Sequence, residues 1–457
     1  MTVAPDASVR EAAERMRAER VSSALIVERE RLVGIVTDRD LRDRVVATGL
    51  DIGVPVGRIA TPDPHTVDVR TTGFDALLLM ARKNVHHVPV LDGTAVAGMI
   101  TTTDVSKHAS TSAVFLASEI YRQDDVEGLK RVSARTRDLQ CNLAAADATA
   151  YATGQVISAI TDALTTRLLQ LAEARLGPPP VAYAWVAAGS QARSEQTARS
   201  DQDNCMVLAD DYDEREHGAY YDALSREVCA GLDACGYIYC PGEMMAMTDT
   251  WRQPQAQWRR YFHKWIDTPE PKALMLTSVF FDLRRIHGDA ALLDDLRRET
   301  LASTRKSGIF LAHLARLALE RRPPLSLFGR ISTARSGPHR GTVDLKMHAI
   351  TPIVDLARIF ALAAGLPAVN TRHRLEAAVE GGELSEQGSR DLRDALEFIS
   401  SQRIRHQVRQ MAADQAPDNF LLPDELSQFE RTQLKDAFKI VAEIQNAVGQ
   451  RYQVASF

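Results

Sequence analysis

The chain has 457 residues, of which 45% are hydrophobic and 25% are charged, and its formal net charge at pH 7 is −5. At about 150 residues per domain, this length predicts roughly three domains, and the ordinary composition excludes a disordered or fibrous protein. The acidic balance gives no reason to expect nucleic acid as a partner. Five cysteines without a C-x-x-C pair exclude a disulfide framework and a zinc knuckle. They indicate a reducing compartment, so we expect a cytoplasmic location.

Membrane segments are not expected from the sequence. No apolar run approaches the roughly 18 to 20 residues that span a bilayer, and the first residues lack the basic and apolar regions of a signal peptide. We therefore expect neither a membrane span nor a membrane partner.

An internal repeat occupies the first hundred residues. In each copy a helical pattern leads into a strand, a turn, a second strand and another helix. The second strand ends in glycine, two apolar residues and threonine, and an aspartate follows three positions after the threonine. At a constant offset of 64, Met16 matches Met80, Gly34 matches Gly98, Thr37 matches Thr101 and Asp40 matches Asp104.

The two motifs, GIVTDRD at 34–40 and GMITTTD at 98–104, resemble the corresponding segments of a CBS domain pair, and the resemblance covers residues 1–110. It implies that the threonine contacts a phosphate and the aspartate binds ribose hydroxyls of an adenine nucleotide effector. A threonine and an aspartate at this spacing also describe plain helix capping. CBS pairs commonly associate, so a homodimer is expected. The positions concerned are Thr37, Asp40, Thr101 and Asp104.

Apolar residues recur at helical spacing between residues 112 and 176, and helical patterning returns after residue 290. The prolines of GPPP at 177–180 end the first helical stretch, because proline lacks a donor and restricts the residue before it. We interpret residues 111–180 as a helical connector that includes the N-terminal part of the next domain, and residues 291–457 as a C-terminal helical bundle. Ser427 and Glu430 predict a capping box at the start of the last helix.

The segment that carries chemistry is VAYAWVAAGSQARSEQTARSDQDNCMVLAD at 181–210. Its pattern predicts a strand ending at Gly189-Ser190, a short helix, and a second strand after Asp201-Gln202-Asp203. Side chains alternate along an extended segment, so Asp201 and Asp203 point to the same side. Two such carboxylates repel one another unless a cation is present, which predicts Mg²⁺ or Mn²⁺. The glycine lets backbone amides approach a phosphate, and the serine hydroxyl donates to it.

This combination resembles the DNA polymerase β-like nucleotidyltransferase superfamily. It is more similar to a bacterial family related to the N-terminal part of PII-protein uridylyltransferase, whose motif is met at every fixed position from Gly189 to Asn204. The resemblance implies a catalytic domain at 181–290, a nucleoside triphosphate substrate and an acceptor that is a protein in the uridylyltransferase. The chain departs from the family at Thr248-Asp249, where Asn-Pro is usual.

The family resemblance also predicts further site residues. A third carboxylate, acting as metal ligand or base, is expected on a neighbouring strand. Asp282, at the end of the apolar run LTSVFFD, is the candidate and Asp289 the alternative, although an aspartate that only caps a strand has the same place. Arg193 and Lys346 are candidates for binding the triphosphate, and both also suit ordinary surface charges.

Together these features predict an α+β multidomain chain. The expected parts are a tandem CBS pair at 1–110, a helical connector at 111–180, a polymerase β-like nucleotidyltransferase domain with a mixed sheet at 181–290 and a helical bundle at 291–457. The predicted function is metal-dependent transfer of a nucleoside monophosphate from a triphosphate to an acceptor, regulated through the CBS pair. The alternative is a nucleotide-sensing protein without turnover. The residues specify neither the base nor the acceptor.

Overall fold

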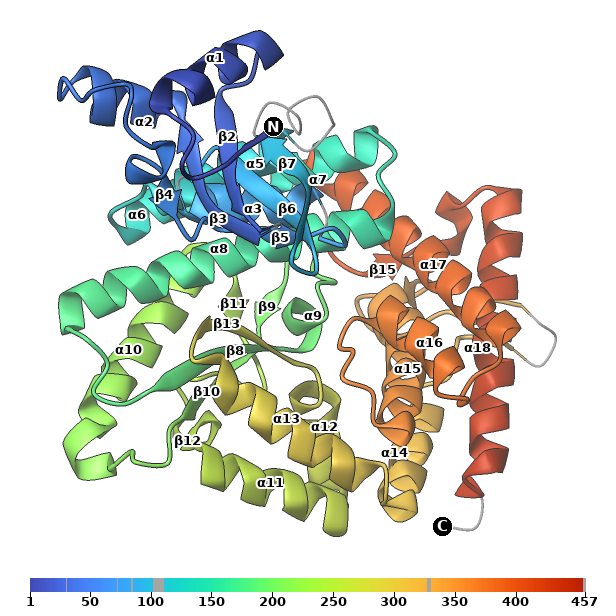
Figure 1. The fold of residues 1–457 in the computed structure, drawn as a ribbon. Helices are drawn as coiled ribbons and strands as arrows, with labels where there is room; N and C mark the ends of the chain where they lie inside the picture. The colour runs from blue at the N-terminus through green and yellow to red at the C-terminus, as the bar shows by residue number, and fades with distance from the viewer. Residues whose placement is uncertain (30, 72, 84, 102–110, 327–329, 455–457) are drawn as a thin grey trace. The chain divides into compact units, whose positions relative to one another are not determined.

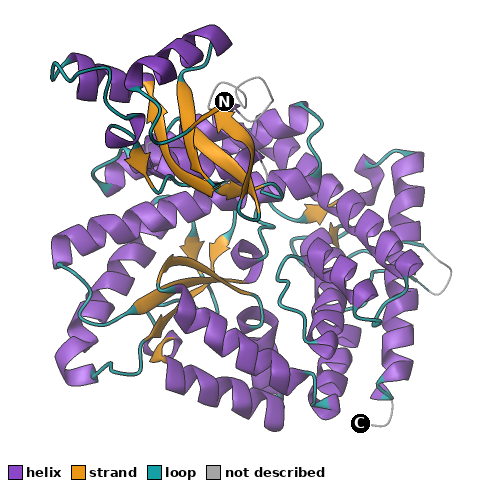
Figure 2. Ribbon diagram, viewed as in Figure 1, coloured by secondary structure: helices purple, strands orange, loops and turns teal. Residues whose placement is uncertain are grey.

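The computed structural model describes residues 1–457 except 30, 72, 84, 102–110, 327–329 and 455–457. The chain divides into two compact units, Met1–Tyr121 and Arg122–Phe457 (Figure 1). Each unit combines helices with strands (Figure 2), so the predicted α+β multidomain class is confirmed.

The first unit contains the sequence repeat. Its first copy comprises β1 (Thr2–Val3), α1 (Val9–Glu19), β2 (Ser23–Glu28), β3 (Arg31–Thr37), α2 (Asp38–Leu41), the π-helical η1 (Arg42–Val46), the 3₁₀-helical η2 (Val56–Arg58) and β4 (Thr61–Pro62). Its second copy comprises β5 (Val67–Asp68), α3 (Gly73–Lys83), β6 (His87–Asp92) and β7 (Ala95–Thr101), and α5 (Thr111–Tyr121) ends the unit.

The repeat is preserved in the pairing of the strands. The sheets have the orders β1-β2-β3-β4 and β5-β6-β7. The antiparallel hairpin β2–β3 begins with Ser23 opposite Thr37, and β6–β7 begins with His87 opposite Thr101. A register shift interrupts both hairpins at the corresponding place. The repeat in sequence is therefore a repeat in backbone geometry.

Helix α1 shows why these residues fold as they do. Its apolar residues Val9, Ala12 and Met16 share one face at helical spacing and pack into the core formed with β2 and β3. The helix begins at Ser8, whose side chain accepts a hydrogen bond from the Glu11 amide at 3.1 Å. Such a cap satisfies an amide that has no partner within the helix.

The second unit opens with helices and a mixed sheet. These elements are α6 (Val126–Ser133), α7 (Thr136–Ala145), α8 (Ala150–Leu176), β8 (Tyr183–Ala188), α9 (Gly189–Ala192), β9 (Asp201–Gln202), β10 (Asn204–Leu208), α10 (Glu214–Ala234), β11 (Ile238–Tyr239), η3 (Asp249–Trp251), β12 (Arg252–Pro254), α11 (Gln255–Asp267), α12 (Pro271–Phe280), β13 (Leu283–Gly288) and α13 (Ala290–Thr304). The sheet order is β12-β10-β8-β13, with β10 and β12 parallel and the other pairs antiparallel. Figure 1 shows this sheet between α8 with α10 and α11 with α13.

The remaining elements form the C-terminal helical region of the same unit. They are α14 (Gly308–Glu320), β14 (Val343–Asp344), the π-helical η4 (Lys346–Ile350), α15 (Thr351–Ala364), α16 (Thr371–Glu380), α17 (Glu386–Ala412), β15 (Phe420–Leu421), η5 (Pro423–Glu425) and α18 (Gln428–Arg451). The capping box predicted at Ser427 and Glu430 is present, with the Ser427 amide donating to Glu430 Oε2 at 2.9 Å.

Helix α8 does more than connect two domains. It ends at Leu176, directly before the glycine and prolines predicted to stop it. It packs against α10 and β13, and Gly154 brings its backbone close to the loop that follows α9. A Cβ atom at Gly154 would lie 2.9 Å from the Ser194 carbonyl oxygen. The long helix thus supports the loop that carries the sequence motif.

One prediction about secondary structure is wrong. The sequence predicts a strand for the run LTSVFFD, which ends in Asp282, whereas Pro271–Phe280 forms helix α12 and a strand begins only at Leu283. A short, continuous apolar run does not distinguish a strand from a buried helix. The proline at the first position of α12 suits a helix start.

A second correction concerns long apolar segments. Lys346–Ala364 is long and apolar enough to span a bilayer, with a mean hydropathy of 1.4, although the sequence suggested no such run. The helix is 72% buried inside the protein, and a core helix passes the same test. Asp355 and Arg358 of this helix form an ion pair at 2.7 Å, which favours its interpretation as a core helix.

Candidate active site

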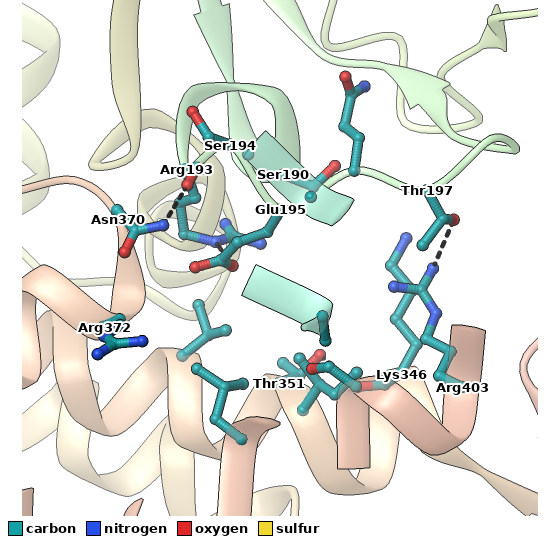
Figure 3. A pocket seen from close by; sticks show the side chains of 18 of the residues that line it. Ser190, Arg193, Ser194, Glu195, Thr197, Lys346, Thr351, Asn370, Arg372 and Arg403 are labelled. Carbon is teal, nitrogen blue, oxygen red and sulfur yellow. Dashed lines mark hydrogen bonds and ion pairs between the residues drawn. The ribbon is translucent and has the colours of Figure 1, made fainter. Parts of the chain in front are cut away.

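A cavity of about 380 Å³ lies in the second unit between the motif at 189–203 and the C-terminal helices (Figure 3). Its walls come from the start of α8, the turn at Gly189 and Ser190, the segment with Asp201 and Asp203, and helices α15, α16 and α17. This volume is within the usual range for small-molecule sites. The structure therefore brings the motif residues to one pocket.

The turn at Gly189 requires glycine for two reasons. Its φ is +56°, a conformation that other residues rarely adopt. A Cβ atom at this position would lie 2.7 Å from Asp203 Oδ2. The backbone of the turn is therefore packed directly against one of the two carboxylates. Ser190 follows in the first turn of α9 and lines the cavity.

The segment around Asp201 and Asp203 alternates as its sequence predicts. Gln202 and Asn204 are buried, and their side chains bind backbone groups of the interior: Gln202 donates to the Tyr237 carbonyl at 2.9 Å, and Asn204 accepts from the Ala246 amide at 2.8 Å. Asp201 and Asp203 line the cavity. The two amides fix the segment so that both carboxylates face the same space.

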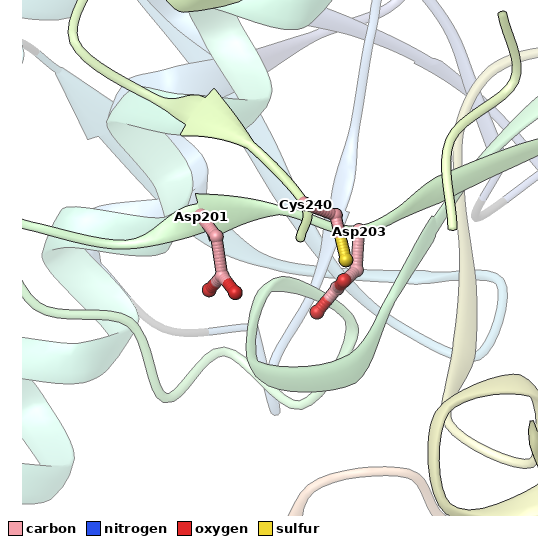
Figure 4. Close-up of side chains that lie close together, drawn as sticks. All are labelled: Asp201, Asp203 and Cys240. Atoms are coloured by element: carbon pink, nitrogen blue, oxygen red, sulfur yellow. The ribbon is translucent and has the colours of Figure 1, made fainter. Parts of the chain in front are cut away.

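Cys240 is a further member of this cluster (Figure 4). Strand β11 pairs in parallel with β9, with Tyr239 opposite Gln202, so Cys240, the residue after β11, lies beside Asp203. One ligand atom from each of Asp201, Asp203 and Cys240 lies within 4.8 Å of the others. Sequence reasoning missed this thiol because only the strand register brings it to the motif.

Burial and the nearby Asp201 carboxylate raise the pKa of Asp203 to about 6. Burial, followed by the charge of Asp203, raises the pKa of the Cys240 thiol to about 11. A carboxylate pair whose ionisation is opposed in this way is what a divalent cation relieves. The paired oxygen ligands fit a hard cation such as Mg²⁺ or Mn²⁺.

Lys346 lies at the same pocket. It starts the π-helical turn η4, a feature that often marks functional sites. Its ammonium nitrogen is 3.9 Å from Asp201 Oδ1. Burial and the neighbouring Arg403 lower the pKa of Lys346. The structure thus places this predicted phosphate ligand beside the carboxylate pair.

Arg193 has a different environment from the one expected of a phosphate ligand. Its Nε donates to Glu195 at 2.7 Å and its terminal nitrogen donates to Asp282 at 2.6 Å. Asn370 of the C-terminal region also donates to the Arg193 carbonyl at 2.7 Å. Two carboxylates therefore compensate this guanidinium, which ties the motif to the C-terminal helices rather than presenting a free charge.

Asp282 also needs a correction. Its side chain is fully buried and is bound by three guanidinium groups. Arg358 donates two bonds, at 3.0 and 2.6 Å, Arg374 donates at 2.5 Å, and Arg193 completes the set. Burial opposes ionisation, but these cations outweigh it and hold the pKa of Asp282 well below its usual range. Both oxygens of this carboxylate accept from arginines, so the structure places Asp282 at the centre of an ion-pair network and outside the cluster of Asp201, Asp203 and Cys240.

The alternative third carboxylate, Asp289, has a local contact of its own. Asp289 caps helix α13 by accepting from the Ala291 amide at 2.9 Å. In the part of the chain that the structure describes, the cluster suited to a metal is Asp201, Asp203 and Cys240. The strands that flank β10 add no carboxylate, because β12 consists of Arg252, Gln253 and Pro254 and β8 is uncharged.

The loop that departs from the family pattern has a structural role. Asp249 forms an ion pair with the buried Arg252 at 2.6 Å, and Arg252 also donates to the Ala246 carbonyl at 3.1 Å. This contact fixes the end of the loop at the start of β12. It does not place Thr248 or Asp249 in the cavity wall.

The expected nucleotide residues of the first CBS copy form a capping box. Asp40 Oδ2 accepts from the Thr37 amide at 2.9 Å and from its hydroxyl at 2.7 Å, and Arg44 pairs with the other carboxylate oxygen at 3.3 Å. In the second copy Thr101 ends β7, and Asp104 lies outside the described residues. The geometry establishes the capping role, and nucleotide binding stays a prediction.

The glycine-serine turn that follows β8 packs against Asp203 and shares one cavity with Asp201 and Lys346, an arrangement that suits binding of a nucleotide phosphate with a cation. Comparison with known families agrees with this interpretation. Residues 134–272 match the family described as "Putative nucleotidyltransferase DUF294", residues 308–452 match "Putative nucleotidyltransferase substrate binding domain", and residues 1–47 and 56–110 match the CBS domain. The chain belongs to the family that joins CBS domains to these two nucleotidyltransferase domains.

Individual relatives match the CBS region. A CBS domain-containing protein of Arabidopsis thaliana, CBSCBSPB3, is 35% identical over 113 residues, 24% of this chain and 20% of its own length. The protein YhcV of Bacillus subtilis is 30% identical over 105 residues, 23% of this chain and 75% of its own length. A solved CBS domain protein of Pyrobaculum aerophilum, complexed with AMP, is 29% identical and covers 26% of this chain and 89% of its own, with a TM-score of 0.24.

Proposed function

We propose that this protein is a metal-dependent nucleotidyltransferase that moves a nucleoside monophosphate from a triphosphate to an acceptor. The observation that carries the proposal is the packing of the Gly189 turn against Asp203, at a cavity that Asp201 and Lys346 also line. This arrangement combines a backbone surface for phosphates, two oxygen ligands for a cation and one positive side chain.

Each part of the site has a role in this proposal. Asp201 and Asp203 hold Mg²⁺ or Mn²⁺, which when bound supplies the charge that neutralises phosphate oxygens. Gly189 lets the turn approach the phosphates, and the Ser190 hydroxyl donates to one of them. An acceptor hydroxyl oxygen attacks the α-phosphorus and its proton passes to solvent. The bond from this phosphorus to the oxygen that bridges it to the β-phosphate breaks, and pyrophosphate leaves near Lys346.

The acceptor and the regulation belong to the same proposal. The resemblance of the motif to PII-protein uridylyltransferase supports a protein as acceptor. The CBS pair supports regulation by an adenine nucleotide at Thr37, Asp40 and Thr101, and a homodimer formed through these domains. The five free cysteines, most of them buried, suit the reducing cytoplasm.

Transfer of label tests this function. Each α-labelled nucleoside triphosphate is incubated with the protein, host-cell lysate and Mg²⁺ or Mn²⁺, and label is followed into macromolecules. We expect transfer by the wild type and a loss of about 100-fold or more in Asp203→Asn, because the metal loses a charged ligand. Asp211→Asn, an exposed carboxylate after β10, is the matched control and keeps full activity.

A nucleotide-sensing protein without turnover is the second candidate. It is favoured by one observation: within the described residues, the carboxylate pair is joined by a thiol and not by a third carboxylate. In that case the wild type binds nucleoside triphosphate with a divalent cation, yet transfers no label from any of the nucleotides. Binding without transfer would therefore replace the first proposal.

A further inference from the structure

Arg403 is a buried cation in the wall of the same cavity. It belongs to α17, its exposed fraction is 8%, and it lines the pocket beside Lys346. Its Nε donates to Asn419 Oδ1 at 2.7 Å, and a terminal nitrogen donates to Thr197 Oγ1 at 3.4 Å. Both acceptors are uncharged. Among the described residues, no carboxylate oxygen lies within 4.0 Å of this guanidinium.

This lack of a counter-ion sets Arg403 apart from the other arginines around the site. Arg193, Arg358 and Arg374 each bind Asp282 directly. A buried charge is unfavourable unless an opposite charge compensates it. Burial lowers the pKa of Arg403 to about 10, and the more distant carboxylates of Asp344, Asp201 and Glu195 offset this only in part. Arg403 is therefore a buried cation whose direct hydrogen-bond acceptors are uncharged and whose charge is offset only by more distant carboxylates.

The surroundings hold this charge in a fixed orientation without cancelling it. Asn419 Oδ1, which accepts from Arg403, also accepts from the Gln407 amide at 3.3 Å. The Asn419 backbone carbonyl accepts from the Leu345 amide at 2.9 Å, one residue before Lys346. One asparagine thus positions Arg403 through its side chain and the segment of Lys346 through its backbone.

Lys346 and Arg403 form a pair of cations on one side of the pocket, across from Asn370 and Arg372 (Figure 3). The charge of Arg403 contributes to the lowered pKa of Lys346, so the two lie close enough to repel. The ion pair of Lys346 with Asp201 is long, with 3.9 Å between the ammonium nitrogen and the carboxylate oxygen. Two adjacent, partly uncompensated cations beside a metal-binding carboxylate pair suit an anion that carries several charges.

We infer that Arg403, together with Lys346, binds the terminal phosphates of the triphosphate and retains the pyrophosphate after transfer. This inference rests on the proposed function and adds the residue that anchors the leaving group. Thr197, in the loop between the Gly-Ser turn and Asp201, contacts Arg403, so the anion is held by the motif and the C-terminal region together. The ligand class is an inorganic or nucleotide-borne polyphosphate.

Calorimetric titration with inorganic tripolyphosphate tests the inference without requiring catalysis. We expect the wild type to bind tripolyphosphate in the presence of Mg²⁺, and Arg403→Gln to bind it about 10- to 100-fold more weakly, as loss of charge-assisted hydrogen bonds predicts. Arg405→Gln is the matched control. Arg405 is on the same helix, is 56% exposed and pairs with Glu430 at 3.8 Å, so its affinity for tripolyphosphate stays unchanged.

A second variant keeps the fold and changes only the charge. Asn419→Asp retains the acceptor at 2.7 Å from Arg403 and gives the guanidinium the carboxylate that it lacks. We expect a higher melting temperature and a loss of tripolyphosphate affinity similar to that in Arg403→Gln. If Arg403 had only a structural role, the melting temperature would rise and the affinity would stay the same.

The outcomes separate this inference from the proposed function. Equal tripolyphosphate affinity in the wild type, Arg403→Gln and Asn419→Asp overturns the inference, even if label transfer is observed. Failure of the wild type to bind tripolyphosphate overturns it as well. Weakened binding in both variants supports the polyphosphate site, and it does so even if no label transfer is found, in which case only the transferase proposal fails.

Discussion

The carboxylate of Asp203, which the proposed metal site needs in its ionised form, lies where burial and a neighbouring carboxylate oppose ionisation. This carboxylate is next to Asp201 and against the backbone of Gly189, and its pKa is raised to about 6. The ordinary value in an unfolded chain is about 3.9. The ionised form is therefore less favourable in the folded protein than in the unfolded chain, and this cost is present when no cation is bound.

Asp203→Asn should consequently stabilise the metal-free protein at pH 7.5. We expect the free energy of unfolding of the second unit to rise by about 1 to 3 kcal/mol, the equivalent of the raised pKa. The folded protein binds more protons than the unfolded chain between about pH 4 and pH 6. The difference in free energy of unfolding between the variant and the wild type is therefore largest above about pH 6 and decreases as the pH falls toward 4.

Denaturant unfolding in EDTA, at pH 7.5 and at pH 4.5, measures this effect. Asp211→Asn is the control, because an exposed carboxylate should change stability by no more than about 0.5 kcal/mol. Adding Mn²⁺ should stabilise the wild type and leave Asp203→Asn unchanged. A destabilised variant at pH 7.5 without metal would show that the carboxylate has favourable partners of its own.

At the scale of elements, the Asp282 network joins parts of the chain that lie far apart in sequence. Arg193 follows α9, Arg358 is in α15 and Arg374 is in α16, and all three meet the residue that precedes β13. Asp355 in turn binds Arg358 and Arg321. This network fixes the C-terminal helices against the motif, so both walls of the pocket are held by one set of ion pairs.

Asp282→Asn should be strongly destabilising, because it leaves buried guanidinium groups without their carboxylate. We expect the free energy of unfolding to fall by about 3 to 5 kcal/mol in urea at pH 7.5. Because the pKa of Asp282 is depressed in the folded protein, its carboxylate stabilises the wild type fully above about pH 4. This contribution to the free energy of unfolding is lost only as the pH falls below that value. The deficit of the variant is therefore constant between pH 5 and pH 8.

Asp289→Asn provides the comparison for this measurement. Asp289 caps α13, and asparagine is an equally good cap, so the variant should differ from the wild type by a few tenths of a kcal/mol at most. A decrease of less than about 1 kcal/mol in the free energy of unfolding of Asp282→Asn would contradict the network, because removing one partner of a buried ion pair costs several times more.

Features governed by local sequence were predictable, whereas those governed by long-range contacts were not. Three features follow from spacings within one segment: the turn at Gly189, the common orientation of Asp201 and Asp203, and the helix cap at Ser427. The partners of Asp282 in α15 and α16 lie 76 and 92 residues away, and no periodicity links them. Cys240 joins the carboxylates only through the pairing of β9 with β11.

At the scale of the whole molecule, the site and the repeat belong to different units. The candidate active site is complete within residues 122–457, and the CBS pair lies within residues 1–121. In the proposed regulation, a nucleotide that binds to the first unit changes the binding of substrate to the second unit, and the size of this change is a coupling free energy. Unfolding should show two transitions, one for each unit, which can be assigned by their response to ligands.

An adenine nucleotide should shift the transition of the first unit. If AMP binds there, a concentration of 100 times its dissociation constant adds about 2.7 kcal/mol to the stability of this unit. Asp40→Ala should abolish the shift, measured by scanning calorimetry with and without AMP. Asp40 also takes part in a helix cap, so the variant itself costs about 1 kcal/mol.

Ser8→Ala is the matched control for that loss. Ser8 caps α1 in the same unit, so its removal has a similar cost in stability without touching the Thr37 and Asp40 pair. The AMP shift should persist in Ser8→Ala. An equal shift in Asp40→Ala would show that this copy does not hold the ribose.

Helix α15 has a consequence for how the chain is handled before it folds. As an isolated segment, Lys346–Ala364 has the length and hydropathy of a membrane anchor. Asp355 and Arg358, which bind partners in the folded interior, would then be exposed near its middle. Each charge at the centre of a span disfavours insertion by about 2.5 to 3.5 kcal/mol. The same charged residues that form ion pairs in the folded protein thus disfavour insertion of the newly made segment into a bilayer.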